Sequence, residues 1–171
     1  MTAARVVVLL GPPAAGKSTV GAELEQRGFR WREWETTILD RWGTRDAFVA
    51  QKAVALPRLH ADIRAWIDQP GAIAAIESTG LSDAAFLDTL GREVGCYVVR
   101  FDVSAPEAER RLAARERGRH LTDDLAGNQR VRREYETRVL PNRRVDLVID
   151  GDRTPAAVAT ARIAAAVRAR P

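Results

Sequence analysis

Residues 11–18 combine two glycines, a lysine and a serine in a spacing suited to holding phosphate groups. The segment reads Gly-Pro-Pro-Ala-Ala-Gly-Lys-Ser and directly follows an apolar run at Arg5–Leu10. It matches G-x-x-x-x-G-K-[ST], a pattern in which loop N–H groups surround phosphates and the next helix adds its positive dipole end. We therefore expect nucleotide contacts from Gly11, Ala14, Ala15, Gly16, Lys17, Ser18 and Thr19.

Lys17 and Ser18 supply the charge and the hydroxyl that this chemistry requires. The ammonium of Lys17 is expected to bridge the β- and γ-phosphates of ATP, and the hydroxyl of Ser18 to ligate Mg²⁺. Only two of the 27 basic residues in the chain are lysines, and one of them stands at this position. The sequence therefore predicts ATP and Mg²⁺ as cofactors.

Acidic residues occur at the ends of two further apolar runs. Glu33 and Glu35 alternate at the end of Phe29–Trp34 and just beyond it, and Glu77 directly follows Ala72–Ile76. Alternate residues of a strand point to one side, so both carboxylates of the first pair are expected to face one cleft. A pair of surface glutamates on an edge strand is the alternative. Glu77 needs a partner if it is buried, which makes it a candidate for the Mg²⁺ site or else for a helix cap or an ion pair.

Strands and helices are predicted to alternate along the chain. Apolar runs rich in β-branched residues predict strands, and longer amphipathic stretches predict the helices between them. This alternation indicates an α/β fold, with right-handed crossovers and a five-stranded parallel sheet flanked by helices. The expected strands are Arg5–Leu10, Phe29–Trp34, Ala72–Ile76, Tyr97–Phe101 and Val145–Ile149, and the expected helices are Lys17–Arg27, Ala47–Ile67, Ala84–Glu93, Pro106–Arg117, Gln129–Val139 and Pro155–Arg168.

Length and composition are those of one ordinary globular domain. The chain has 171 residues, of which 46% are hydrophobic and 29% charged, and a formal charge of +4. We expect a single domain over residues 1–171, because single cores usually hold about 100–200 residues. The charge excess is small and dispersed, which argues against nucleic acid as a partner. No apolar run is long enough to span a membrane, and the single cysteine suits a cytoplasmic protein, expected to be a monomer or a homodimer.

The order of these motifs resembles that of the shikimate kinase and nucleoside monophosphate kinase group of P-loop proteins, over most of the chain. Phe29–Glu35 looks like the second strand of shikimate kinases, which ends in two alternating acidic residues, here glutamates in place of aspartates. The resemblance implies a P-loop NTPase fold, with Glu33 nearest the acceptor hydroxyl and Glu35 as a substrate contact. Related kinases carry a Walker-B-like acid or a glycine-rich substrate loop where this chain has Glu77 and Gly80.

The arginine-rich segment after Pro106 is similar to the lid of monophosphate kinases, in which R-[LI]-x-x-R precedes G-R and an acidic pair. That likeness implies an Arg-rich helical lid at about residues 115–128. It places Arg111 against the adenine and Arg115 and Arg119 at the transferring phosphate. Planar guanidinium groups can meet the phosphate oxygens bidentately.

Three other arginines are candidates for holding an anionic acceptor. Arg132 lies in a segment that resembles the R-x-x-x-Y helix of both families, although its arginines are out of register with Tyr135. Arg41 and Arg58 lie between the second and third predicted strands, the region that binds the acceptor in this group. Ordinary exposed helix charges are the alternative for Arg41 and Arg58.

The leading hypothesis is an ATP- and Mg²⁺-dependent small-molecule kinase that phosphorylates a hydroxyl of a polar or anionic metabolite or an antibiotic. A nucleoside monophosphate kinase is the second hypothesis. A polynucleotide end kinase or RNA-binding protein and a non-catalytic nucleotide-sensing module are the others. Four tryptophans gather between residues 31 and 66, where they serve either as core packing or as aromatic walls for a ring-bearing acceptor.

Overall fold

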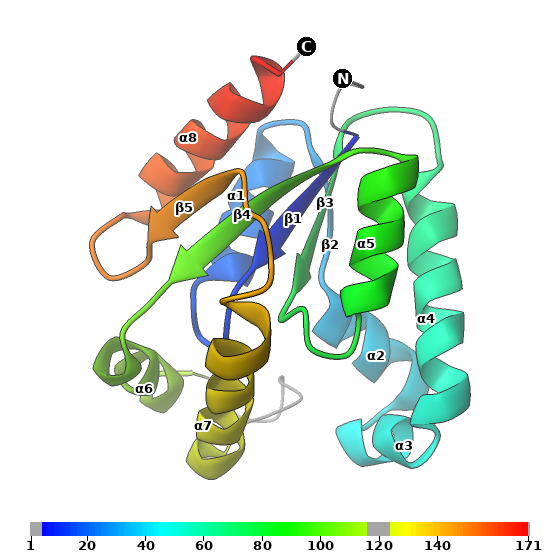
Figure 1. The fold of residues 1–171 in the computed structure, drawn as a ribbon, viewed down its shortest axis with the longest axis vertical. Coiled ribbons are helices and arrows are strands. Elements are labelled where there is room, and N and C mark those ends of the chain that lie inside the picture. Colours follow the sequence, from blue (N-terminus) through cyan, green and yellow to red (C-terminus); the bar gives the residue numbers. More distant parts are fainter. Residues whose placement is uncertain (1–4, 116–123, 171) are drawn as a thin grey trace.

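The structure is a computed structural model that describes residues 5–115 and 124–170. In this part of the chain, five parallel strands form one sheet in the order β2-β3-β1-β4-β5 (Figure 1). The strands are β1 (Val6–Leu10), β2 (Arg30–Arg32), β3 (Ala74–Ser78), β4 (Cys96–Asp102) and β5 (Leu147–Asp150). The predicted five-stranded parallel sheet is thus confirmed.

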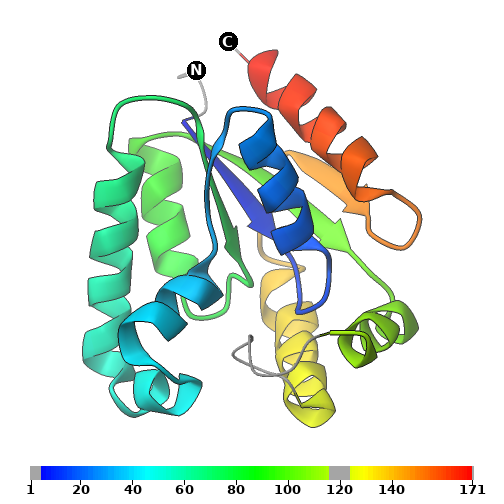
Figure 2. The same cartoon turned by 180° about the vertical axis from the view of Figure 1, so that it is seen from behind.

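Helices cover both faces of the sheet (Figures 1 and 2). They are α1 (Lys17–Gln26), α2 (Trp34–Trp42), α3 (Arg45–Ala50), α4 (Lys52–Ile67), α5 (Ala84–Glu93), α6 (Ala105–Ala113), α7 (Leu125–Glu134) and α8 (Ala156–Arg168). A π-helical turn, η1 (Tyr135–Val139), continues α7. No helix in residues 5–115 or 124–170 is long and apolar enough to cross a membrane.

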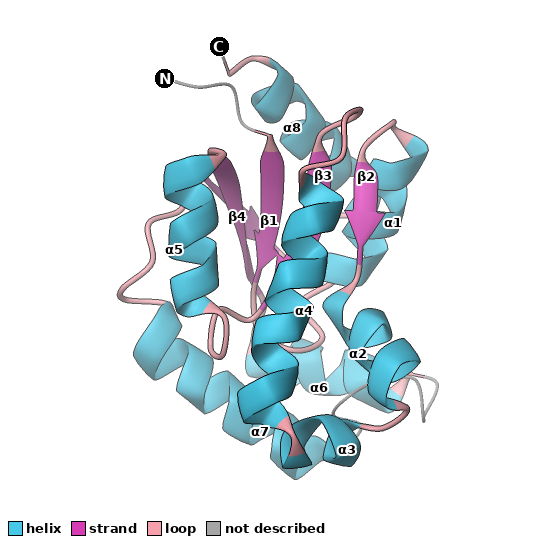
Figure 3. Ribbon diagram, turned by 90° about the vertical axis from the view of Figure 1, so that its right-hand side faces the viewer, coloured by secondary structure: helices cyan, strands magenta, loops and turns pink. Residues whose placement is uncertain are grey.

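The central strand β1 divides the hydrophobic core in two. Val7 and Leu9 pack toward α1 and α8 with Leu24 and Ile163, whereas Val8 packs toward α4 and α5. Figure 3 shows the sheet with α4 and α5 on one side and α1 and α8 on the other. All five residues of β1 are buried, as expected for a strand covered on both faces. The P-loop that follows β1 is therefore anchored to a strand that is buried along its whole length.

Helix α1 lies unusually close to β2 because Gly21 has no side chain. A Cβ atom at Gly21 would be 2.3 Å from the ring of Trp31, far inside van der Waals contact. Trp31 itself packs against the core cluster beside α1. Core packing is therefore the role of this tryptophan, and the close contact fixes the position of β2 relative to the P-loop helix.

The segment between β2 and β3 differs most from the prediction. Strand β2 has three residues and the chain turns directly into α2, which the sequence analysis did not predict. The expected helix Ala47–Ile67 is two helices, because the Thr44 side chain caps α3 at the Ala47 N–H and the backbone leaves helical geometry at Gln51. Three helices therefore surround the space beside the P-loop, where one was expected.

Candidate active site

The P-loop folds as the sequence predicts, between the end of β1 and the start of α1. Ala14 and Gly16 adopt left-handed backbone conformations, with φ of 60° and 91°, and these turn the loop inward. The Lys17 ammonium donates hydrogen bonds to the carbonyls of Gly11 at 2.9 Å and Pro12 at 2.8 Å. Burial lowers the pKa of Lys17, and the nearby Glu77 carboxyl opposes that shift. A buried ammonium thus lies over a loop whose geometry suits phosphate.

Glu77 meets the P-loop from the neighbouring strand. In the β1–β3 register it lies opposite Leu9, and Ser18 Oγ donates to Glu77 Oε2 at 3.2 Å. Burial raises the pKa of Glu77 to about 7, while the charge of Lys17 acts in the opposite direction. Hydroxyl and carboxylate oxygens are the hard ligands that Mg²⁺ prefers, and a buried carboxyl gains a partner when a cation binds. Ser18 and Glu77 therefore fit the predicted metal position.

Glu33 and Glu35 do not alternate along a strand, so that part of the prediction is wrong. The chain becomes helical at Trp34, which is buried, and Glu33 is the N-cap residue of α2. Glu33 Oε2 accepts a hydrogen bond from Thr36 Oγ1. Glu35 lies in the first turn of α2. Side chains two positions apart point to the same side of a strand but to different sides of a helix. The two carboxylates consequently have different surroundings.

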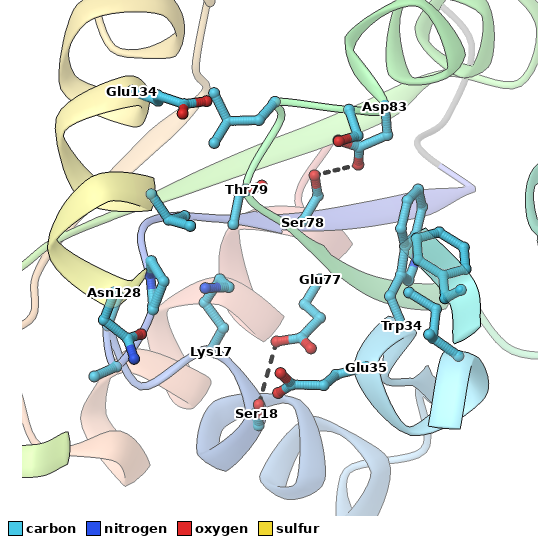
Figure 4. A pocket seen from close by; sticks show the side chains of 18 of the residues that line it. Lys17, Ser18, Trp34, Glu35, Glu77, Ser78, Thr79, Asp83, Asn128 and Glu134 are labelled. Atoms are coloured by element: carbon cyan, nitrogen blue, oxygen red, sulfur yellow. Dashed lines mark hydrogen bonds between the residues drawn. The ribbon is translucent and has the colours of Figure 1, made fainter. Parts of the chain in front are cut away.

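A cavity of about 570 Å³ opens beside the P-loop and contains Glu35 but not Glu33 in its lining. Figure 4 shows the carboxylate of Glu35 next to the Ser18–Glu77 pair, with Lys17 close by. Arg115 also lines the cavity. The structure thus brings together two carboxylates, a hydroxyl, an ammonium and a guanidinium at the carboxyl ends of the strands, where ligands bind in open α/β sheets.

A second cavity, of about 220 Å³, lies on the other side of the P-loop. Thr19, Phe101 and Ile149 contribute to its wall, together with Arg111. The Arg111 guanidinium donates to the Gly151 carbonyl at 2.6 Å and is also paired with Glu107. Arg111 thereby joins the P-loop side to the loop after β5, and the apolar wall beside it suits the adenine that the sequence analysis assigned to it.

The other predicted acceptor contacts lie outside the cavity lining. Arg41 forms an ion pair with Asp62, and Arg58 is exposed. Arg132 donates to the Val103 carbonyl and pairs with Glu136. The structure therefore does not place these arginines where they would hold an acceptor. Arg41 is instead paired between α2 and α4, Arg132 is paired within and beyond its own helix, and Arg58 is an exposed helix charge.

Gly80 and the lid complete the predicted set. Gly80 has φ of 74°, and a Cβ there would lie 3.0 Å from Val139 Cγ1 and 3.1 Å from Leu10 Cδ1, so this glycine allows a tight turn against η1. It is not among the residues of the cavity wall. Arg119 and most of the predicted lid lie outside the described residues, whereas Arg115 and Asn128, on either side of that stretch, line the cavity.

Sequence reasoning missed Asp83 and Lys52. Asp83 is the buried N-cap residue of α5, and its carboxylate accepts a hydrogen bond from Ser78 Oγ, which in turn accepts from the Gly80 N–H at 2.6 Å. Lys52 Nζ donates to Ser82 Oγ at 2.9 Å. Both residues line the cavity. An aspartate directly before a predicted helix and the second of two lysines were the available signals.

Glu77→Gln is expected to remove a pH dependence from the stability of the ligand-free protein. Because the folded-state pKa of Glu77 is about 7, against an ordinary 4.5, the folded chain holds a proton that the unfolded chain has released between these values. The proton bound to Glu77 thus stabilises the folded chain, and this contribution to the free energy of unfolding is fully present below the ordinary pKa of 4.5. We expect it to fall by about 3 kcal/mol as the pH rises from the ordinary pKa through the folded-state pKa.

Urea unfolding at mildly acidic and mildly alkaline pH measures this change in the wild type and in Glu77→Gln. Titrating groups distant from Glu77 contribute equally to both proteins and cancel in the comparison. Identical pH slopes in the two proteins would show that Glu77 titrates near its ordinary pKa.

No model of a known protein family matches the chain, and no curated protein matches its sequence. Solved structures do match the fold. A shikimate kinase from Acinetobacter baumannii in complex with shikimate is similar with a TM-score of 0.71 and 19% identity, covering 96% of this chain and 93% of that one. A sugar kinase from Janibacter sp. HTCC2649 is similar with a TM-score of 0.62 and 17% identity, covering 96% and 98%.

A third match binds a nucleotide. The YorR protein from Bacillus subtilis, in complex with phosphorylated GDP, is similar with a TM-score of 0.61 and 15% identity, covering 95% of each chain. At such low identities, the structural similarity establishes a shared fold over nearly the whole length and no more. The P-loop fold predicted from residues 11–18 and from the alternation of strands and helices is thus confirmed.

Proposed function

We propose that this protein is an ATP- and Mg²⁺-dependent phosphotransferase that moves the γ-phosphoryl group of ATP to a hydroxyl of a small molecule. One observation carries the proposal. The P-loop residues Lys17 and Ser18 open into the same cavity as the carboxylates Glu35 and Glu77. Phosphate-binding groups and groups able to orient a hydroxyl therefore share one enclosed space.

Each half of the site has a defined task in this reaction. The P-loop N–H groups and the Lys17 ammonium bind the β- and γ-phosphates, and Arg111 lies beside the adenine pocket. Arg115 faces the cavity and offsets the negative charge that spreads over the equatorial oxygens during transfer. Ser18 and Glu77 would hold Mg²⁺, which when bound would offset the negative charge of the phosphates.

Glu35 is the carboxylate that we assign to the acceptor. It lies in the cavity wall beside Ser18 and Glu77, whereas the Glu33 carboxylate accepts a hydrogen bond from Thr36 Oγ1 and is not part of that wall. The acceptor oxygen forms a bond to the γ-phosphorus, the bond from that phosphorus to the β–γ bridging oxygen breaks, and ADP leaves. The hydroxyl proton passes to Glu35, which orients the attacking oxygen before transfer.

A nucleoside monophosphate acceptor is less well supported by this cavity. Such an acceptor carries a phosphate that needs cationic partners, and arginine is the usual residue for that task. Arg41 and Arg58, two of the arginines predicted to hold an anionic acceptor, are paired with Asp62 and exposed, respectively. A hydroxyl compound without a phosphate group agrees better with the wall formed by α2, α3 and α4.

Coupled measurement of ADP release with a panel of hydroxyl compounds tests the proposal. The panel contains sugars, shikimate, nucleosides, nucleoside monophosphates, amino alcohols, aryl alcohols and oligonucleotides. We expect release that depends on one class of small hydroxyl compound and on Mg²⁺, with a phosphorylated product visible by ³¹P NMR. ATP binding without transfer to any member would instead favour a nucleotide-sensing module, and transfer only to oligonucleotides would favour an end kinase.

A further inference from the structure

The half of the cavity farthest from the P-loop is mainly apolar. Its wall combines side chains from three helices: Trp34 and Ile38 of α2, Phe48 and Val49 of α3, and Leu56 of α4. Val49 contributes to this wall and is 48% exposed to solvent. Apolar surface in a concave site is the part that a ligand covers with a gain in free energy of about 25 cal/mol per Å².

The charges of this half are unsuited to an anion. Two carboxylates, Glu35 and Glu77, face the cavity where the apolar wall meets the P-loop. Among the described lining residues from α2, α3 and α4, Lys52 is the cation, and its ammonium is hydrogen-bonded to Ser82. The guanidinium groups of Arg115 and Arg130 belong to segments after β4, and the proposed function gives Arg115 to the nucleotide phosphates.

We propose that the acceptor is a hydroxyl compound with an apolar body and no anionic group, neutral or cationic, bound between α2, α3 and α4. This inference rests on the proposed function for its phosphoryl-transfer step. The hydroxyl of the acceptor lies at Glu35, and the ring or hydrocarbon body of the acceptor covers Ile38, Val49 and Leu56. An acceptor carboxylate in the same place would be desolvated beside two glutamates, which is costly.

Three aryl alcohols of equal size and different charge test this inference. They are para-xylylene glycol, para-(aminomethyl)benzyl alcohol and para-(hydroxymethyl)benzoate, which share one ring and one hydroxymethyl group. Saturation-transfer NMR and calorimetry measure their binding to the full chain, with and without Mg²⁺ and a non-hydrolysable ATP analogue. We expect the neutral and cationic members to bind at millimolar concentration or below, and the carboxylate to bind at least about tenfold more weakly.

A matched pair of variants on α4 locates the binding. Leu56→Arg adds a cation to the cavity wall, whereas Val54→Arg adds the same charge at a position that is 56% exposed and not part of the wall. We expect Leu56→Arg to reduce the discrimination against the carboxylate by about tenfold or to invert it, and Val54→Arg to behave as the wild type. Circular dichroism and thermal unfolding of both variants verify that they are folded.

Two results of the binding measurements would overturn the inference. The first is equal or tighter binding of the carboxylate to the wild-type protein, and the second is no saturable binding of the neutral and cationic members. Binding of the ATP analogue is measured in the same samples. If the aryl alcohols bind as expected but the analogue does not, the proposed kinase function fails, and what stands is the class of ligand that the cavity binds. If ATP is consumed only with anionic acceptors, the acceptor class fails while the kinase function stands.

Discussion

Replacing Lys17 with methionine should reduce phosphoryl transfer by about 10²–10³-fold, the range found when one preorganised donor to a transition state is removed. The ammonium of Lys17 is buried over the loop and directed by the Gly11 and Pro12 carbonyls. Methionine has a similar length without the charge, and burial already disfavours that charge by lowering the Lys17 pKa. The fold should therefore be retained while the phosphates lose a cationic partner.

Single-turnover transfer with the acceptor found in the panel measures this loss, and thermal unfolding verifies the fold. Lys52→Met is the matched control, because it removes the other lysine of the chain, whose ammonium contacts Ser82 at the acceptor wall. We expect this control to change the KM for the acceptor more than the rate of transfer. Near-normal transfer by Lys17→Met would contradict the role of Lys17 at the phosphates and, with it, the assignment of residues 11–18 as the nucleotide site.

The nucleotide side of the site was predictable because the groups that bind phosphate come from consecutive residues. The spacing in residues 11–18 requires a strand before it and a helix after it, and the structure has β1 and α1 in those places. Glu77 was also predictable in position, since an acid that directly follows a buried strand lies at the same sheet edge as the P-loop. Its hydrogen bond with Ser18 joins two segments 59 residues apart.

The acceptor side was predicted poorly because its geometry depends on where β2 ends. A strand that continued to Glu35 would have turned both carboxylates to one side. Burial of Trp34 and Ile38 on one face of α2 favours a helix instead, since these residues are spaced i, i+4. Local alternation in Glu33-Trp34-Glu35 could not reveal that competition between a short edge strand and a buried helical face.

Arginine abundance caused the remaining errors. Arg41, Arg58 and Arg132 lie in the segments expected to bind an acceptor, but ion pairs or exposure account for the positions of all three. In a chain with so many guanidinium groups, helical i, i+4 pairing with acids is the commoner outcome. Only tertiary contacts distinguish such a pair from a ligand clamp.

Glu35→Gln should reduce phosphoryl transfer by about 10²–10⁴-fold with little change in ATP binding, because an amide cannot accept the hydroxyl proton. Glu35 lies at the junction of the nucleotide and acceptor halves, beside Ser18 and Glu77 (Figure 4). Glutamine keeps the size of the side chain and so preserves the cavity. Transfer rates at saturating ATP and acceptor measure the loss, and fluorescence titration with an ATP analogue measures nucleotide affinity.

Glu33→Gln is the control that decides between the two neighbouring carboxylates. The Glu33 side chain accepts a hydrogen bond from Thr36 at the start of α2, so its substitution should lower the free energy of unfolding by about 1 kcal/mol or less. We expect its effect on transfer to be less than about tenfold, well below the general-base range. The reverse pattern is a collapse of transfer in Glu33→Gln with normal transfer in Glu35→Gln. It would assign the proton-accepting role to Glu33, the residue that the shikimate kinase resemblance indicated. Normal transfer in both variants, with collapse in Glu77→Gln, would move the proton acceptor to β3, where the same carboxylate would have to serve both the hydroxyl and the metal.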